Sequence, residues 1–517
     1  MRQTAVRPGV LGSPFPRVGV VILTWNKKDY VLALLDSLAQ HPYPNWDVLV
    51  VDNCSSDRTR EAVLEKHPWV DLVTTPVNLG GSGGFNAGLC AMLKRGGYDY
   101  LWLLDNDVVV EPGALEVLVE TLESRPDAAV AGSHMIQLDR PETTNEIGAD
   151  VDLARGRLLL GHHTSLSWLH QDEVFEVDYV AAASLLVRFP VLEEVGIWDD
   201  FFIHYDDVDW CLRIRGAGYA VLACAASRIR HLSANAKRVT WILYYDIRNI
   251  LYLQNKHASY GFRHYLFFSL LLLLHAMRNE LGGKSYHALL LERALLDFFS
   301  GRMGKREDLP ALTTEPAREV LEAILTRRRC TVLVLEPARG VVLSEEDLAR
   351  IEHGGGSVLG ICHELEMNLG SLPARARRLR LSPHRLLMVL QVLRRALFSR
   401  RADYLMLDID HAAGFLGLCA RRIVLLADDR CVVVPGGYVR LFRALGWPLR
   451  WARALGKLVS FACARQSRRG CARMTPADFE QRLAALGGTL DAGSRCADRV
   501  APPSATDAAG DPPRRQD

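Results

Sequence analysis

The first hundred residues alternate between short apolar runs and segments with helical periodicity. The apolar runs cover residues 18–23, 46–52, 71–75 and 100–104, and helical segments at 27–40 and 57–66 separate the first three. Strands that alternate with helices at this short spacing form a mostly parallel sheet with helices on both faces. The sequence therefore predicts an α/β fold in which the carboxyl ends of these strands meet at one edge.

The fourth run ends abruptly in Asp105, Asn106 and Asp107, at the sheet edge where α/β proteins bind ligands. Buried carboxylates are costly unless they are paired or bound to a cation. Two such side chains one residue apart can share a divalent ion such as Mg²⁺ or Mn²⁺. The same three residues are also common in turns, so the triplet alone leaves a metal site and a plain turn both open.

A glycine-rich stretch at 78–88 follows the third run and precedes a helix that we expect to end near Leu93. Glycine lets the backbone approach a ligand closely, and a helix N-terminus favours phosphate, so the stretch fits a diphosphate. Its spacing differs from a dinucleotide-binding fingerprint, and the chain contains no P-loop motif. A tight packing turn between helix and strand is the alternative.

Polar residues at three strand ends and the glycine-rich segment would together form a pocket suited to a sugar nucleotide. The motifs that make it are Thr24-Trp25-Asn26, Asp52-Asn53-x-Ser55-x-Asp57, Asn78-x-Gly80-x-x-x-Gly84-x-Asn86-x-Gly88 and Asp105-x-Asp107. Their order and spacing resemble the inverting glycosyltransferases of family 2, which have the Rossmann-like GT-A fold. The resemblance implies that the nucleotide sugar is bound by Thr24, Trp25, Asn26, Asp52, Asn53, Asn78, Gly80, Gly84, Asn86 and Asp105.

A second group of motifs lies further along the chain. Residues 177–188 resemble the small-residue segment that this family places beside the acceptor, and residues 195–213 resemble its acidic segment. Asp206-Asp207 stands where the family normally has Glu-Asp, which implies Asp207 as the catalytic base and Asp206 as a catalytic neighbour that raises its pKa or orients it. A solvated helix start is the alternative for this acidic cluster. The residues expected at the acceptor are Trp198, Ala182, Ala183 and Asp209, the last in an acceptor-binding or structural role.

His231 follows a short strand where the family places a third metal ligand. The resemblance thus implies that Asp105, Asp107 and His231 hold Mg²⁺ or Mn²⁺, which would neutralise the leaving nucleotide diphosphate. Asp207 would take the proton of the acceptor hydroxyl in a single inverting displacement. An ordinary loop histidine is the alternative for His231.

The donor stays open between UDP-galactofuranose, which the glycine-rich stretch favours, and dTDP-rhamnose. Asn106 stands where the polymerising galactofuranosyltransferases have a third Asp, which weakens the match to that group. Residues 244–249, followed by Lys256-His257, resemble a helix of the rhamnosyl- and galactofuranosyl-type members. An inactive sugar-nucleotide-binding module is the alternative class, but the intact acidic residues and His231 argue against it.

The resemblance covers residues 17–260, which we expect to be a GT-A catalytic domain. The remaining divisions that we predict are a flexible arm at 1–16, an apolar helical segment at 261–300, an accessory α/β domain at 301–494 and a disordered tail at 495–517. Apolar runs at 330–337, 357–362 and 403–408 predict strands of the accessory domain. Asp408-Ile-Asp410-His411 copies the metal pattern without its surrounding motifs, and we interpret it as a turn.

Positive charge is concentrated in the accessory region. Arginine clusters at 375–401, and basic and aromatic residues interleave at 438–469 without any acidic residue. A basic amphipathic helix with aromatic residues is typical of membrane-surface elements, although a solvated helix face packed on the accessory domain fits the same pattern. We expect a peripheral enzyme on the inner face of the cytoplasmic membrane that acts on a glycan or polyprenyl-diphosphate-linked acceptor.

Composition argues against several other classes. The formal net charge of +2 gives no global case for nucleic acid. No stretch reaches the roughly 18 apolar residues that a spanning helix needs, which also disfavours a processive membrane synthase. None of the 11 cysteines forms a Cys-x-x-Cys pair, so we expect neither a zinc site nor a disulfide framework, and a reducing cytoplasm fits.

Overall fold

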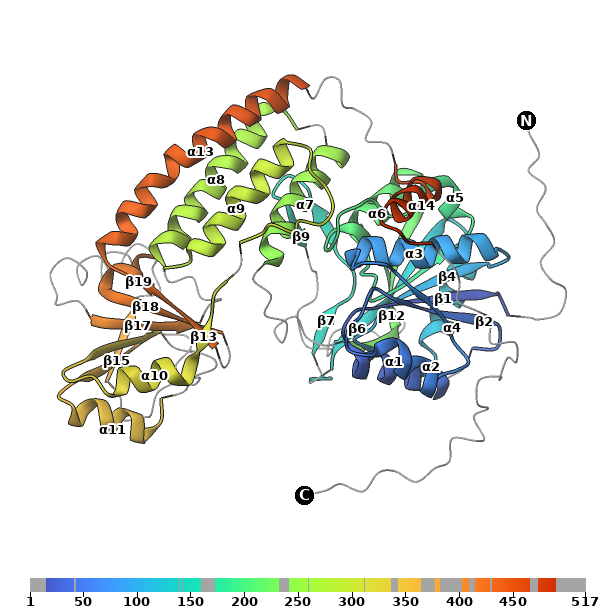
Figure 1. Cartoon of the computed structure of the whole chain (residues 1–517). Coiled ribbons are helices and arrows are strands. Elements are labelled where there is room, and N and C mark those ends of the chain that lie inside the picture. The colour runs from blue at the N-terminus through green and yellow to red at the C-terminus, as the bar shows by residue number, and fades with distance from the viewer. Residues whose placement is uncertain are drawn as a thin grey trace, which may run out of the picture.

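Two sheets with a layer of helices between them organise the chain (Figure 1). The computed structural model describes residues 15–489 except 41–42, 139, 142, 160–172, 232–240, 259, 311, 336–342, 364–376, 382–401, 409–413, 428–429 and 465–472. Within these residues the first half of the chain forms a ten-stranded sheet and the second half a seven-stranded sheet. The predicted α/β class with a second, smaller sheet is confirmed.

The first sheet is built around the four runs that the sequence singled out. Its main strands are β1 (Val18–Thr24), β2 (Trp46–Asp52), β3 (Asp71–Thr74), β4 (Tyr100–Asp105), β6 (Ala128–Gln137), β11 (Ser184–Arg188) and β12 (Ala220–His231). β3, β2, β1 and β4 lie side by side and parallel. β11 then pairs antiparallel with both β4 and β6, and β12 runs parallel to β6. Short strands extend this frame: β5 (Val108–Val110), β7 (Thr144–Glu146) and β10 (Val174–Glu176).

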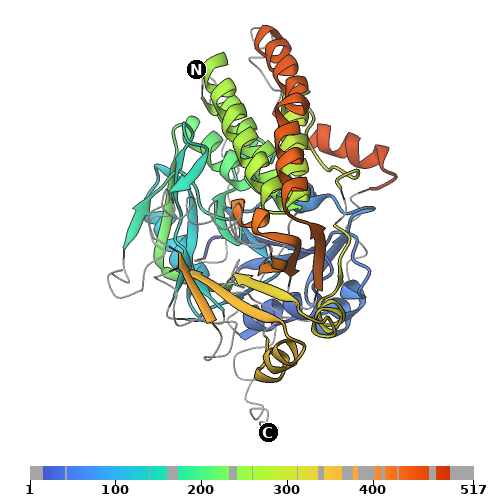
Figure 2. The ribbon, with the colours of Figure 1, turned by 90° about the vertical axis from the view of Figure 1, so that its left-hand side faces the viewer.

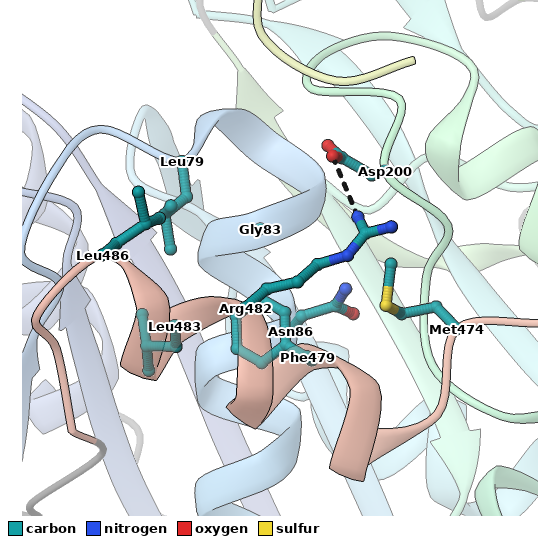
Figure 3. A pocket seen from close by; sticks show the side chains of 9 residues that line it. All are labelled: Leu79, Gly83, Asn86, Asp200, Met474, Phe479, Arg482, Leu483 and Leu486. Atoms are coloured by element: carbon teal, nitrogen blue, oxygen red, sulfur yellow. Dashed lines mark hydrogen bonds and ion pairs between the residues drawn. The ribbon is translucent and has the colours of Figure 1, made fainter. Parts of the chain in front are cut away.

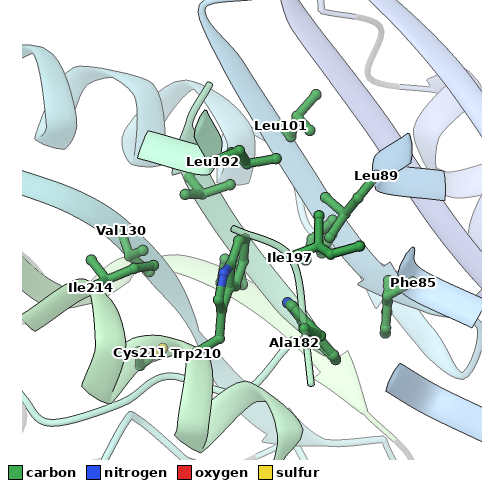
Figure 4. Close-up of a cluster of buried hydrophobic side chains, with 14 of the residues drawn as sticks. Phe85, Leu89, Leu101, Val130, Ala182, Leu192, Ile197, Trp210, Cys211 and Ile214 are labelled. Carbon is green, nitrogen blue, oxygen red and sulfur yellow. The ribbon is translucent and has the colours of Figure 1, made fainter. Parts of the chain in front are cut away.

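Helices cover both faces of the first sheet (Figure 1). One face carries α1 (Lys28–Gln40), α2 (Thr59–Lys66) and α4 (Ala114–Ser124), and the other carries α3 (Gly80–Arg95), α5 (Val191–Val195), α6 (Asp206–Gly216) and α14 (Pro476–Ala485). Figure 4 shows the core on the second face, where Trp210 of α6 lies near Ile197 and opposite Phe85 and Leu89 of α3. Because both faces are buried, β1, β2 and β4 are apolar along most of their length instead of alternating.

Helix α3 differs from the prediction, because the glycine-rich stretch forms its first turns instead of preceding it. A Cβ at Gly84 would lie 2.3 Å from Leu23 Cδ1, and one at Gly88 would lie 2.2 Å from Val21 Cγ1. A side chain at either position would push the helix away from β1. Gly84 therefore packs against the sheet instead of facing a nucleotide sugar as expected, and the packing alternative accounts for both glycines.

Four long helices form the layer between the sheets: α7 (Ile242–His257), α8 (Phe262–Leu281), α9 (Ser285–Phe299) and α13 (Tyr438–Ala464). They share one apolar cluster, to which α8 contributes Tyr265 and Leu272 and α13 contributes Trp447 and Trp451. The apolar segment predicted at 261–300 corresponds to α8 and α9.

The second sheet contains β13 (Glu315–Pro316), β14 (Thr331–Leu335), β15 (Ser357–His363), β16 (Arg377–Leu381), β17 (Ala402–Asp408), β18 (Ala420–Ala427) and β19 (Arg430–Pro435). β14 is central and parallel to β15 on one side and to β17 on the other, with β16 and β18 next outward. This is a doubly wound order, flanked by α10 (Ala317–Leu325) and α11 (Glu345–His353). The predicted strands match β14, β15 and β17, whereas Asp410 and His411 lie outside the described residues.

After α13 the chain returns to the first sheet. α14 packs Phe479 and Leu483 into the core on the α3 side, and Glu480 pairs with Lys94 of α3 at 2.9 Å. The segment predicted as one accessory domain at 301–494 therefore does not stay in one spatial unit. We propose that the catalytic unit includes α14. The predicted arm and tail lie outside the described residues, apart from Phe15 and Pro16.

Replacing Gly88 by Ala is expected to lower the free energy of unfolding by about 1–3 kcal/mol, because the added Cβ overlaps Val21 in a packed core. The matched control is Gly456→Ala in α13, where the added Cβ would meet no neighbouring side chain or other element within 4 Å. That change is expected to stabilise its helix by about 1 kcal/mol. Urea unfolding of the two variants measures both effects, and a Gly88→Ala protein as stable as the wild type would contradict the packing role of α3.

Candidate functional site

The carboxyl ends of β1, β2 and β4 are held together by hydrogen bonds. Asn106, just after β4, donates to Thr24 Oγ1 at 3.0 Å, and the N–H of Asn53 donates to the carbonyl of Thr24 at 2.9 Å. Thr24 and Asp52 are buried, whereas Trp25 is 46% exposed. The three strand ends that carry the predicted nucleotide-sugar residues thus converge on one edge.

The loop after β1 is fixed to the loop after β2. Asn26 adopts a left-handed conformation with φ of 49°. Its N–H donates to Ser55 Oγ at 2.9 Å, and its Oδ1 accepts from the N–H of Ser56 at 2.7 Å. Asp52 Oδ1 accepts from the N–H of Ser55 at 3.1 Å. Asn26 and Asp52 therefore shape the two loops at this edge.

Asn53 and Asn78 hold the start of α3. Asn53 Oδ1 accepts from the N–H of Leu79 and from Thr75 Oγ1, both at 2.9 Å, and its Nδ2 donates to the carbonyl of Gly80 at 2.9 Å. Asn78 Oδ1 accepts from the N–H of Gly80 at 2.8 Å. These amides position the α3 N-terminus that was predicted to face the diphosphate.

The loop before α6 is conformationally strained. Phe202, His204 and Tyr205 all have positive φ angles, of 70°, 62° and 66°. Gly80, with φ of 73°, packs on this loop so closely that a Cβ would lie 2.1 Å from the carbonyl oxygen of Phe202. Such strain persists only where the surrounding structure determines the conformation, and it concentrates at functional sites.

Helix α7 holds the strained loop in place. Asn249 Nδ2 donates to the carbonyls of Ile203 at 2.8 Å and His204 at 2.9 Å. Arg248, also buried, donates to the carbonyl of Phe201 at 2.8 Å. The segment at 244–249, which the sequence singled out only by its resemblance to the family, therefore holds the loop before α6 in its conformation.

Asp206 and Asp207 are the first two residues of α6. Asp207 accepts from the N–H of Ala182 at 3.2 Å and from the N–H of Val208 at 2.8 Å. Burial raises the pKa of both carboxyls, and the charge of Asp207 raises that of Asp206 further. A carboxylate with a pKa moved toward neutrality suits a general base, as the sequence had implied for Asp207.

Asp105, Asp107 and His231 form a compact cluster in which one ligand atom from each residue lies within 4.8 Å of the others. The pairing of β5 with β12 sets His231 opposite Val108 and so beside Asp107, where Nε2 lies 3.2 Å from Asp107 Oδ1. Asn145 Nδ2 lies 3.3 Å from the other ring nitrogen and orients the imidazole. Two carboxylates and an imidazole are a suitable donor set for Mn²⁺ or Mg²⁺.

The acid pair and this cluster lie at the same edge of the sheet. β11 runs antiparallel to β4 with Ser184 opposite Leu104, so the residues just before β11 lie next to Asp105. Those residues include Ala182, which donates to Asp207, and Ala183, which is buried. The two alanines predicted at the acceptor therefore form the backbone between the two carboxylate groups.

Glu146 was missed by the sequence reasoning. Tyr179 donates to its Oε1 at 2.6 Å, and the residue is near enough to Asp207 and His231 to be affected by both charges. Burial raises the pKa of Glu146 to about 7. The hydrogen bond from Tyr179 lowers this pKa, and the charge of Asp207 raises it. β7 is three residues long and has no apolar run, so only its pairing with β6 reveals the position.

Asn86 and Trp198 have a different place from the one expected. Asn86 Nδ2 donates to the carbonyl of Trp198 at 2.8 Å, and the N–H of Trp198 donates back to Asn86 Oδ1 at 2.9 Å. The Trp198 ring is 1% exposed and packs 4.9 Å from Phe85 and 5.8 Å from Trp210. Because both side chains are engaged inside the core, they fasten the acidic segment to α3 instead of contacting nucleotide sugar or acceptor.

Of the two roles expected for Asp209, acceptor binding or structural support, the contacts fit structural support. It is fully buried and pairs with Arg213 at 3.0 Å, Lys256 at 2.8 Å and His257 at 2.8 Å. Burial alone would raise the pKa of Asp209, but the charges of Arg213 and Lys256 hold it well below its usual range. This network ties α6 to α7 and leaves Asp209 no surface for an acceptor.

A pocket of about 100 Å³ lies between α3 and α14 (Figure 3). Its lining residues are Leu79, Gly83, Asn86, Asp200, Met474, Phe479, Arg482, Leu483 and Leu486. Arg482 reaches from α14 to Asp200 at 3.3 Å, and the N–H of Met474 donates to Asp199 at 3.2 Å. The returning end of the chain therefore supports the segment that leads to the acid pair.

Glu146 is expected to make stability depend on pH. Its folded pKa of about 7 lies above the ordinary 4.5, so the folded state keeps a proton that the unfolded state releases between these values. The free energy of unfolding should therefore fall as pH rises through this window, and Glu146→Gln should flatten the slope. Urea unfolding in the presence of a chelator measures it. Glu61→Gln, on the exposed face of α2, should keep the wild-type slope, and an unchanged slope in Glu146→Gln would contradict the environment described for this carboxyl.

Comparison with known proteins places the first sheet among glycosyltransferases. Residues 19–176 match the model of the glycosyl transferase family 2 domain. The chain is 28% identical over 247 residues to the O-antigen biosynthesis protein RfbC of Myxococcus xanthus, which is 46% of this chain and 19% of the relative. It is 25% identical over 197 residues to the galactofuranosyltransferase GlfT2 of Mycobacterium tuberculosis, 35% of this chain and 31% of the relative.

A third relative is the N-acetylglucosaminyl-diphospho-decaprenol L-rhamnosyltransferase of Mycobacterium tuberculosis, 25% identical over 239 residues, 42% of this chain and 76% of the relative. The chain thus spans less than a third of the length of the first two relatives. The family match ends before Asp207 and His231, whose places rest on the structure. From the matched segment and the sheet that it forms, we conclude that the chain carries a glycosyltransferase domain of family 2.

Proposed function

We propose that the protein is a metal-dependent, inverting glycosyltransferase of cell-envelope polysaccharide synthesis. It would transfer a sugar from a nucleotide-diphosphate sugar to a glycan or lipid-linked acceptor. The observation that carries the proposal is the presence, at one edge of the sheet, of the Asp105–Asp107–His231 cluster and the Asp206–Asp207 pair. An inactive binding module, the alternative class, would have no need of either group.

The donor half of the site would be formed by the ends of β1, β2 and β4. Trp25 offers an exposed aromatic face for a base, and the loops fixed by Asn26 and Asp52 frame it. Asn53 and Asn78 set the α3 N-terminus, whose dipole favours the diphosphate. Held by the cluster of two carboxylates and an imidazole, Mn²⁺ or Mg²⁺ would neutralise the charge of the leaving diphosphate.

Asp207 would accept the proton of the attacking acceptor hydroxyl. Its two backbone hydrogen bonds keep the carboxylate in one orientation, and burial moves its pKa toward neutrality. Burial and the charge of Asp207 raise the pKa of Asp206, so Asp206 tends to keep its proton and leaves the negative charge on Asp207. Attack on the face opposite the leaving group inverts the anomeric centre in one displacement.

For the donor we propose UDP-galactofuranose, with dTDP-rhamnose as the second candidate. A galactofuranosyltransferase and a rhamnosyltransferase are both among the relatives, which supports the two sugars named from the sequence. The name of the rhamnosyltransferase includes a diphospho-decaprenol group, which supports a lipid-linked acceptor for this protein. We place such an enzyme at the inner face of the cytoplasmic membrane.

Asp207→Asn is expected to lower turnover by roughly 100-fold or more, because general base catalysis contributes about that much. Nucleotide binding should persist, because the amide keeps the size of the side chain. Transfer from UDP-galactofuranose and dTDP-rhamnose to a membrane extract measures turnover. Asp127→Asn, an exposed carboxylate before β6, is the matched control and should turn over normally. Near-normal turnover of Asp207→Asn would refute the assignment of the base.

A thermal-shift panel of UDP, dTDP and GDP, with and without Mn²⁺, tests the donor site. A nucleotide at about 100 times its dissociation constant stabilises by roughly 2.7 kcal/mol, which moves the transition by several degrees. We expect a metal-dependent shift with UDP that His231→Ala removes and His353→Ala, on the exposed end of α11, retains. A shift with dTDP alone would select rhamnose, and no shift with any nucleotide would count against the enzyme.

A further inference from the structure

Helices α8 and α13 lie side by side and antiparallel in the layer between the sheets (Figures 1 and 2). Arg440, near the start of α13, pairs with Glu280, near the end of α8, at 2.7 Å. Toward the other ends, the rings of Phe461 and Tyr265 lie 5.6 Å apart. One face of each helix is therefore used in packing, and the opposite faces determine what the pair presents to its surroundings.

The outer face of α13 is apolar, although nothing in the described residues covers it. Phe442 is 74% exposed and Leu449 is 81% exposed. Leu445 and Val459 extend the same stripe and are 58% and 55% exposed. These residues follow helical spacing on the side away from Trp447 and Trp451, which are buried. The helix thus has two apolar faces, of which only one is packed.

Helix α8 repeats this arrangement. Phe267 and Leu274 are 60% and 62% exposed, and Leu270 and Leu271 between them are 45% and 40% exposed. All four lie opposite the packed residues of α8, of which Leu272 is one. The apolar run that the sequence showed at 266–274 therefore divides into an inner half, which builds the core, and an outer half, which faces away from it.

Basic residues border both stripes, and carboxylates are absent from them. Arg443, Arg453 and Lys457 are exposed on α13, and Arg263 and Arg278 are exposed near the two ends of the α8 stripe. Arg450 is also exposed on α13 but pairs with Glu292 of α9 at 2.6 Å. α13 contains no acidic residue, and Glu280 of α8 is buried against Arg440. Within the described residues no carboxylate pairs with Arg443 or Arg453, so their charge is available to an anionic partner.

We propose that the exposed stripes of α8 and α13, with their bordering arginines and lysine, form a docking surface for the headgroup region of an anionic lipid bilayer. Among the described helices, none has the length and apolar character of a membrane span. Helices that combine an apolar stripe with basic flanks lie in the plane of the interface. The proposal deepens the membrane contact of the proposed function but does not depend on the catalytic assignments.

Charge complementarity selects a bilayer over a second copy of the chain. If two copies met through these stripes, their arginines would face one another without any carboxylate from either helix to offset them. An anionic leaflet instead attracts each basic side chain while its acyl region accepts the phenylalanine and leucine side chains.

Sedimentation of the full chain with phosphatidylcholine vesicles, with or without phosphatidylglycerol, tests the proposal. We expect binding only to the anionic vesicles, and less of it as salt is raised. Phe442→Ser with Leu449→Ser should lower the partition coefficient on the order of 100-fold, because both side chains would leave the acyl boundary. The control Leu64→Ser removes an exposed leucine of α2 and should bind as the wild type does.

A second pair of variants separates charge from stability. Arg443→Gln with Arg453→Gln should weaken binding roughly 30-fold. Arg60→Gln with Arg328→Gln removes the same net charge from exposed sites on α2 and after α10 and should have no comparable effect. Equal effects of the two charge pairs, binding to neutral vesicles alone, or no vesicle binding by the wild type would overturn the proposal.

The same variants test a second copy of the chain as the partner. If the wild type is a dimer and the double variant Phe442→Ser with Leu449→Ser is a monomer, the surface binds a second copy instead of a bilayer. The nucleotide-induced thermal shift should be unchanged in every variant, so a failure here is distinct from a failure of the proposed function.

Discussion

Two adjacent carboxyl groups in a poorly solvated position are the constraint on which the site depends. Asp206 and Asp207 would repel one another and lose hydration at the start of α6, so the surrounding structure must hold them there. Backbone N–H groups of Ala182 and Val208 satisfy Asp207, and the loop before the pair is held in a left-handed conformation by buried side chains. The strain and the raised pKa values are two results of the same enforced geometry.

The groups that enforce this geometry come from distant parts of the sequence. Asn86 fastens the segment from α3, Asn249 supports the loop from α7, and Arg482 reaches Asp200 from α14. None of the three stands at the strand ends where the donor would bind. The proposed donor half and the proposed base are therefore supported by different parts of the chain: the donor half would be formed by the strand ends and the start of α3, and the acid pair is held by contacts from α3, α7 and α14.

The sequence predicted the frame of the site better than its supporting contacts. Apolar strands that end in Asp52 or Asp105 are visible because burial and turn chemistry follow short-range patterns, and parallel pairing then brings their ends together. The tasks of Asn86 and Trp198 were misjudged because a motif shows which residue is present but not where its side chain points. Glu146 was missed because its position depends on the pairing of a three-residue strand. The assignment of Gly84 to packing required the distance to Leu23.

The return of α14 to the first sheet makes the unit built around that sheet discontinuous in the chain. A ribosome would deliver Met474 and Phe479, which complete the core beside α3, only after the whole second sheet. Until then the side of α3 that α14 covers, with Leu79 and Leu93 nearby, would be open to solvent or to a chaperone. Maturation of the site is thus coupled to synthesis of the accessory sheet, and a fragment that ends before α14 would lack part of its core even though it contains every predicted catalytic residue.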